Sequence, residues 1–224
     1  MNLVSLDWGR IAADLDARGC ATTGLILTAR ECDALIAGYD DDARFRSRVV
    51  MQRHNYGQGE YRYFAYPLPE TVAALRAELY PHLAEIANRW EGGFPCGHAA
   101  YLKQCHTAGQ TRPTPLILKY GVGDYNRLHQ DLYGEMVFPL QATVLLSDPD
   151  DFEGGEFVMT ETRPRTQSRA EVVRLGRGEA VIFAVNRRPI KTTRGTAKVA
   201  MRHGVSRLRA GRRFTLGVIF HDAK

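Results

Sequence analysis

The sequence lacks the features that mark membrane and secreted proteins. No uninterrupted apolar stretch approaches the roughly 20 residues that a membrane-spanning helix needs. The first residues, MNLVSLDWGRIAADLDARG, show no basic start followed by an apolar run, so they do not resemble a secretory signal. The few cysteines are irregularly spaced and do not indicate a disulfide framework: Cys20, Cys32, Cys96 and Cys105. These absences predict a cytoplasmic protein with free thiols and no membrane partner.

Acidic residues are also missing from the segment 187–213, which contains many Lys and Arg side chains. The whole chain has 30 basic and 25 acidic residues and a net charge of +5, so the basic excess is local. Such a segment attracts phosphates, nucleic acid or acidic small molecules. Two interpretations stay open. The segment is either a solvated basic edge with one or two residues that bind an anionic cosubstrate, or a nucleic-acid surface that includes Arg187 and Arg188.

Length and patterning predict a single domain over residues 1–224. A chain of 224 residues with 44% hydrophobic content suffices for one sizeable core and is short for two. We expect residues 1–113 to be helical and to support the β core. Short β-rich runs separated by turn residues follow over 114–222. We therefore expect an α+β protein with a mainly β core.

Two helices are predicted in the supporting segment. The capping-box pattern of residues 28–31, Thr-Ala-Arg-Glu, predicts a helix over about 29–38. Pro69 and Glu70 then open a longer stretch with apolar side chains at helical spacing, which predicts a second helix that ends near Trp90.

The stretch from Tyr120 to Glu135, YGVGDYNRLHQDLYGE, contains a candidate metal site. If residues 128–132 are extended, the side-chain period of two places His129 and Asp131 on one face. A metal held by two His and one carboxylate keeps positions open for a bidentate cosubstrate and for dioxygen, which is why non-haem iron oxygenases use this set. An H-x-D pair alone is weak support, because a surface polar pair has the same pattern.

The third ligand must come from a distant strand, and His203 meets this condition. Ten residues later, Arg213 begins the apolar strand RFTLGVIF, and Thr215 shares its face. A guanidinium beside a hydroxyl suits bidentate binding of a carboxylate, as the distal end of 2-oxoglutarate requires. Arg212 lies on the opposite face of the predicted strand and is expected at the surface.

These motifs together resemble the iron(II)/2-oxoglutarate-dependent dioxygenases, especially their prolyl-hydroxylase-like branch. In that branch a Tyr-x-x-Gly turn leads into the H-x-D, as residues 120–123 do here, and a Gly-Gly-Glu follows, as residues 154–156 do here. A distal His and a basic residue ten positions later complete the order. The resemblance covers residues 114–222 and implies a double-stranded β-helix, a jelly-roll-like barrel with helices packed outside.

The resemblance also implies cofactors and roles. It implies iron(II) as the metal, with 2-oxoglutarate and O₂ consumed and a substrate C–H bond hydroxylated; hydroxylation of an N-methyl group leads to demethylation. One departure is that many prolyl hydroxylases anchor 2-oxoglutarate with Lys, whereas this chain has Arg. The implied ligands are His129, Asp131 and His203 for the metal, and Arg213, Thr215 and Tyr120 for the cosubstrate.

The substrate is a separate question. The run RHGVS at residues 202–206, with RRFTLGVIFHDA, resembles a bacterial family of such oxygenases described as acting on damaged nucleic acid. Under that hypothesis aromatic and basic side chains contact the substrate, although the alternation of EYRYFAYP also fits a strand that covers the barrel mouth without any ligand. The candidate substrate-binding residues are Tyr61, Tyr63, Tyr125, Arg187 and Arg188.

Other functions stay open at this point. One is hydroxylation of a protein side chain such as proline, or of a small metabolite. Another is a zinc protein, because Cys96, His98, Cys105 and His106 form C-x-H-x6-C-H, although without the paired spacing of most structural zinc sites. The last is a binding module that keeps the barrel but has lost the chemistry.

Overall fold

The computed structural model describes residues 3, 5–132, 134–193 and 195–224. Its α-helices are α1 (Trp8–Arg18), α2 (Ala29–Ala37), α3 (Glu70–Trp90) and α4 (His98–Thr107). Short 3-10 helices lie at Gly38–Asp40, Asp42–Arg44, Met51–His54 and Pro149–Asp151. Among the described residues, no helix is long and apolar enough to cross a membrane.

Seven strands form the major sheet, and all neighbouring pairs in it are antiparallel. In spatial order they are β1 (Cys20–Leu25), β11 (Glu179–Ala184), β7 (Leu140–Leu145), β15 (Arg213–Val218), β5 (Leu116–Tyr120), β4 (Glu60–Phe64) and β2 (Phe45–Val50).

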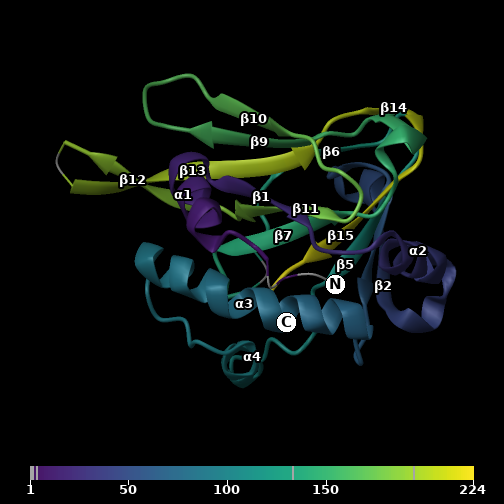
Figure 1. Ribbon diagram of the computed structural model, residues 1–224, viewed down its shortest axis with the longest axis horizontal. Helices are drawn as coiled ribbons and strands as arrows, with labels where there is room; N and C mark the ends of the chain where they lie inside the picture. The colour runs from purple at the N-terminus through teal and green to yellow at the C-terminus, as the bar shows by residue number, and fades with distance from the viewer. Residues whose placement is uncertain (1–2, 4, 133, 194) are drawn as a thin grey trace.

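A minor sheet lies over the major one, and α3 covers the opposite face of the major sheet (Figure 1). The strands of the minor sheet, in spatial order, are β10 (Arg169–Val173), β9 (Phe157–Thr162), β13 (Gly195–Val205), β6 (Tyr125–His129) and β3 (Gly57–Gln58). Strand β12 (Arg187–Thr192) also belongs to this sheet and pairs with β13. A separate pair consists of β8 (Phe152–Gly154) and β14 (Leu208–Gly211). Two facing antiparallel sheets with helices outside are the double-stranded β-helix expected from the sequence.

Both predicted helices are present. α2 begins with the expected capping box: the Glu31 backbone N–H donates to the Thr28 hydroxyl at 3.3 Å, and the Thr28 backbone N–H donates to the Glu31 carboxylate at 2.8 Å. α3 runs from Glu70 to Trp90 and buries the predicted apolar side on the core.

The prediction that residues 1–113 form only a helical support is wrong in part, because this segment also contributes strands to the sheets. Three strands of this segment, β1, β2 and β4, belong to the major sheet. β1 has the sequence CATTGL and β2 the sequence FRSRVV, and neither shows a clear apolar alternation. β1 and β2 are the two edge strands, where one side of the ladder is unpaired and side chains are partly solvated.

A buried ion pair joins α3 to the end of the chain. The Arg76 guanidinium donates to the Asp222 carboxylate at 2.9 Å, and both side chains are almost fully buried. Arg76 also donates to the carbonyl of Ile219 at 2.8 Å, and the Tyr66 hydroxyl donates to Asp222 at 2.9 Å. This network holds α3 against the segment that follows β15, and so supports the sheet that carries the candidate site.

Candidate metal centre

The pairing of β6 with β13 brings two histidines together. His203 on β13 is the direct cross-strand partner of His129 on β6, and their ring centroids are 4.3 Å apart. Residues 74 positions apart in the chain become neighbours through this ladder. The sequence prediction that a distant strand returns beside the H-x-D is therefore met by the fold.

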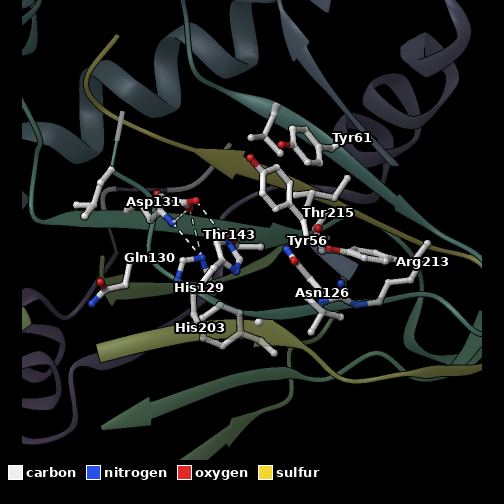
Figure 2. Close-up of a pocket in the computed structure, with 18 residues that line it drawn as sticks. Tyr56, Tyr61, Asn126, His129, Gln130, Asp131, Thr143, His203, Arg213 and Thr215 are labelled. Atoms are coloured by element: carbon white, nitrogen blue, oxygen red, sulfur yellow. Dashed lines mark hydrogen bonds and ion pairs between the residues drawn. The ribbon is translucent and has the colours of Figure 1, made fainter. Parts of the chain in front are cut away.

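Asp131 completes the cluster from a loop. The predicted extended segment 128–132 is only partly a strand, because β6 ends at His129. The Asp131 carboxylate nevertheless lies 3.4 Å from His129 Nε2 through Oδ1 and 3.3 Å from His203 Nε2 through Oδ2. One atom from each of the three residues lies within 4.8 Å of the others, and Figure 2 shows the three side chains converging.

The electrostatics of the cluster suit a cation. Burial raises the pKa of Asp131, but hydrogen bonds to His129 and His203 and their charge outweigh it and hold this pKa well below its usual range. Burial lowers the pKa of His203 and keeps its ring neutral. For His129, contacts with Asp131 overcome burial and raise the pKa. A divalent metal would take the place of these protons, since its ligands must be deprotonated.

The two rings are oriented by different means. His129 Nδ1 lies 2.7 Å from the Arg127 carbonyl oxygen, which fixes the proton on Nδ1 and leaves the Nε2 lone pair for a metal. His203 Nδ1 is buried and has no hydrogen-bond partner among the described residues. Its ring is instead packed by Phe157, nearly parallel at 5.9 Å, and by Phe183 at 4.5 Å. Contacts with two aromatic rings thus orient the His203 ring in place of a hydrogen bond to its Nδ1 atom.

This donor set fits iron(II). Two imidazole nitrogens and one carboxylate are the ligands of non-haem iron oxygenases, whereas structural zinc sites take four protein ligands, usually with Cys. The alternative zinc site receives no support among the described residues: His98 contacts the Phe220 carbonyl, His106 contacts Asp222, and Cys96 is exposed while Cys105 is buried. In the part of the chain that is described, the His-Asp-His cluster is the one group of potential metal ligands.

Arg213 forms the second half of the site. It begins β15, its side chain is only 3% exposed, and burial lowers its pKa to about 10. Its Nη1 atom is buried without a hydrogen-bond partner among the described residues. A buried guanidinium nitrogen without an acceptor fits the carboxylate of a bound anion. Arg212 is exposed, as the alternation predicted.

Gly155 makes room for this arginine. Its φ is +66°, and a Cβ at this position would lie 2.9 Å from Arg213 Cδ. The Gly-Gly-Glu motif of the sequence therefore has a structural reason at its second glycine. It permits a turn with positive φ and the close approach of the Arg213 side chain.

The His-Asp-His cluster and Arg213 line one cavity of about 390 Å³ between the two sheets. It is large enough for a cosubstrate beside a small substrate group. Of the cosubstrate and substrate candidates, Tyr61, Tyr120, Arg213 and Thr215 line it. The cavity-lining polar residues not singled out from the sequence are Tyr56, Asn126, Gln130, Gln141 and Thr143.

The remaining candidates lie elsewhere. Tyr63 is nearly buried under the Arg46 guanidinium, and Tyr125 lies under that of Arg207, at 4.4 and 4.9 Å. Arg187 is exposed on β12, away from the cavity lining. Arg188 is 2% exposed and its Nε donates to Glu161 at 2.9 Å. The prediction that Arg188 binds the substrate is therefore wrong, because its guanidinium is held in an internal ion pair.

Comparisons with known proteins agree with this geometry. Residues 59–223 match the model of a family described as an oxygenase catalysing oxidative methylation of damaged DNA. Uncharacterised proteins from two strains of Mycobacterium tuberculosis are 47% identical over 189 residues, which is 81% of this chain and 78% of theirs.

Solved structures share the fold. A prolyl-4-hydroxylase from Pseudomonas putida superposes with a TM-score of 0.57 at 14% identity, over 94% of this chain and 96% of that one. A 2-oxoglutarate/iron(II) oxygenase family member from Burkholderia pseudomallei gives a TM-score of 0.60 at 16% identity, over 100% and 95%.

Proposed function

The chain belongs to the family of oxygenases described as acting on damaged DNA, and we propose that it is an iron(II)- and 2-oxoglutarate-dependent dioxygenase. The observation that carries the proposal is the placement of a His-Asp-His cluster and a buried arginine with an unpartnered N–H in one cavity. The first group matches the iron ligands of such enzymes, and the second matches the anchor of an anionic cosubstrate.

In this proposal each residue has a defined task. His129, Asp131 and His203 hold the iron, and Arg213 binds the distal carboxylate of 2-oxoglutarate, with the Thr215 hydroxyl beside it. Tyr120, which is fully buried, closes this end of the cavity. When bound, iron and 2-oxoglutarate together activate O₂, so that one oxygen atom enters succinate, CO₂ is released and the other enters a substrate C–H bond.

The proposed substrate is an alkylated base of damaged DNA. The family description supports this class of substrate. Hydroxylation of an N-methyl group gives an N-hydroxymethyl group, which breaks down to formaldehyde and the free amine. The net outcome would be removal of a methyl group. Because a stacked base is out of reach of a buried metal, the base would have to be extruded or single-stranded.

One tyrosine of the cavity lining suits the stacking of a planar ligand. Tyr56 lines the cavity, is 50% exposed and stacks on His54 at 5.3 Å between centroids. Its backbone is fixed at both ends, since its N–H donates to the Met51 carbonyl at 3.1 Å and its carbonyl accepts from Arg127 at 2.8 Å. A half-exposed aromatic ring on a fixed loop suits stacking of a nucleobase.

Exposed arginines outside the cavity lining lie on the two strands that carry the histidines. Arg127 on β6 and Arg202 on β13 are exposed, and they lie on the strands that carry the two histidines. Neither forms a salt bridge with a described carboxylate. They are available for backbone phosphates of a nucleic acid, and binding should then weaken as salt is raised. A cytoplasmic location is part of the proposal and agrees with four free cysteines.

The test is coupled turnover. Purified protein with iron(II), 2-oxoglutarate and O₂ is offered an N-methylated single-stranded oligonucleotide, its unmethylated counterpart, or a proline-containing peptide. We expect succinate and formaldehyde in equal amounts with the methylated oligonucleotide alone, and none with a His203→Ala variant. Stimulation by the peptide with a hydroxylated product would instead establish a protein hydroxylase.

A further inference from the structure

The strand that carries His129 is irregular. β6 pairs with β13 at His129 and again at Asn126, and the register shifts between the two pairs. Two residues of β6, at positions 127 and 128, therefore lie opposite a single residue of β13, Gly204. This arrangement is a β-bulge, a feature that often occurs beside active sites and changes the direction of a side chain.

Gly204 makes room for the bulge. A Cβ at position 204 would lie 2.6 Å from the Asn126 carbonyl oxygen and 3.1 Å from the Arg127 carbonyl carbon. Both are backbone atoms, which cannot move aside as the end of a flexible side chain can. Glycine permits such a close approach of two strands. The glycine that directly follows His203 in the sequence therefore has a structural reason.

The bulge changes which side chains of β6 face the cavity. In a regular strand, residues three positions apart point to opposite faces of the sheet. Asn126 and His129 are three positions apart, and yet both line the cavity. The extra residue thus adds to the cavity lining an amide that regular alternation would turn away from it.

The Asn126 side chain lies toward the end of the cavity that contains Arg213. In the view of Figure 2 it lies between the two histidines and Arg213. The Arg213 guanidinium carbon is 5.9 Å from the centroid of the Tyr120 ring. Burial raises the pKa of Tyr120, and the charge of Arg213 and a contact with the Asn126 side chain oppose this rise. Asn126 and Arg213 therefore both lie close to the tyrosine that closes this end.

A carboxylate that is bound by Arg213 can accept further hydrogen bonds. It has about four acceptor positions, and a guanidinium that binds it bidentately occupies about two of them. The N–H groups of a neutral amide suit the remaining positions. They donate hydrogen bonds without adding a second buried charge, which would itself need a partner.

We propose that Asn126 is a further cosubstrate-binding residue, whose side-chain amide donates to the distal carboxylate of 2-oxoglutarate together with Arg213. The inference rests on the proposed function, because it concerns the same cosubstrate. The bulge then gives β6 two tasks, since His129 faces the metal and Asn126 faces the cosubstrate.

The experiment compares two ligands by calorimetric titration in the presence of manganese(II) and without oxygen. 2-Oxoglutarate has the distal carboxylate, whereas 2-oxopentanoate has the same metal-chelating 2-oxo acid but ends in a methyl group. Wild type, Asn126→Leu and Gln58→Met are titrated with each ligand, at concentrations that saturate wild type. Gln58→Met is the matched control, because it removes an amide from the neighbouring strand β3, outside the cavity lining.

The expected loss is selective for one ligand. Asn126→Leu should bind 2-oxoglutarate about ten to a hundred times more weakly than wild type, which corresponds to one hydrogen bond to a charged group. Its Kd for 2-oxopentanoate should equal that of wild type, because this ligand has no distal carboxylate. Gln58→Met should bind both ligands as wild type does.

Asn126→Asp gives a second test of the same contact and serves if Asn126→Leu does not fold. It keeps the size of the side chain but replaces the donor with a charge that repels a carboxylate, so 2-oxoglutarate should bind at least as weakly as to Asn126→Leu. Unchanged binding of 2-oxoglutarate in a folded variant, an equal loss for both ligands, or an equal loss in Gln58→Met would overturn the inference. Failure of wild type to bind 2-oxoglutarate would overturn the proposed function itself.

Discussion

Replacing Arg213 by Met separates the ligand-binding role of this residue from its effect on the fold. Its guanidinium is 3% exposed, and no described carboxylate forms a salt bridge with it. A buried charge without a close partner destabilises the folded state, which is also why its pKa falls to about 10. Met keeps the length without the charge. We expect the ligand-free variant to be more stable than wild type by about 1 to 3 kcal/mol.

The same substitution should remove most of the stabilisation by 2-oxoglutarate. Loss of one partner of a buried, hydrogen-bonded charge pair costs about 2 to 5 kcal/mol of binding free energy, and about 2.7 kcal/mol corresponds to a hundredfold rise in Kd. At a 2-oxoglutarate concentration of about 100 times the wild-type Kd, the ligand stabilises wild type by about 2.7 kcal/mol but the variant by about 0.4 kcal/mol. For a domain of this size the rise in Tm should fall from about 5–10 °C to about 1 °C.

The assay is calorimetric unfolding in the presence of manganese(II), with and without 2-oxoglutarate. Arg212→Met is the matched control, since this neighbouring arginine is exposed and should leave both values unchanged. A variant at position 213 that is less stable than wild type and still gains the full ligand-induced shift would refute the reasoning. Arg213 would then be a structural residue.

Three further changes test the site and its support. Asp131→Ala should abolish stoichiometric metal binding in a titration while far-UV circular dichroism stays unchanged, because one of three ligands is lost. Gly155→Ala should raise the 2-oxoglutarate requirement about tenfold or more by displacing Arg213, whereas Gly24→Ala, with a φ of +81° and no atom within 4 Å of the added Cβ, should cost only stability. Asp222→Asn should lower the unfolding free energy at neutral pH by about 3 kcal/mol. The folded-state pKa of Asp222 is lowered, so its contribution is present above the unfolded value of about 3.9 and is lost as pH falls through the folded value, and the two proteins should converge in acid denaturation.

The metal ligands could be predicted because they depend on short-range patterns that the fold preserves. His129 and Asp131 are two residues apart and stay together even though the strand ends between them. His203 on β13 of the minor sheet precedes Arg213 on β15 of the major sheet by ten residues, and both side chains line the cavity between the sheets. These spacings can be recognised in the sequence because the chemistry requires particular residue types at fixed separations.

Burial could not be predicted in the same way. Arg187 and Arg188 are equivalent in the sequence, yet one is exposed and the other is buried against Glu161, because side chains alternate across the β12–β13 pair. Tyr61 and Tyr63 show a similar split, since one lines the cavity and the other packs under Arg46.

Long-range pairing explains the strands that were missed. β1 is held by β11, which lies more than 150 residues further along the chain, so local propensity carries little of the signal. Gln141 did have a signal, a lone amide in an apolar strand, but its partner Asp131 is brought near only by the fold.

The central claim is that one cavity binds iron(II) and 2-oxoglutarate together. The most direct measurement adds both to the purified protein without oxygen and records the weak visible charge-transfer band of the iron chelate. We predict a band in wild type that is absent in His203→Ala. A well-folded wild-type protein that shows no band, or a band that persists in the variant, would contradict the account.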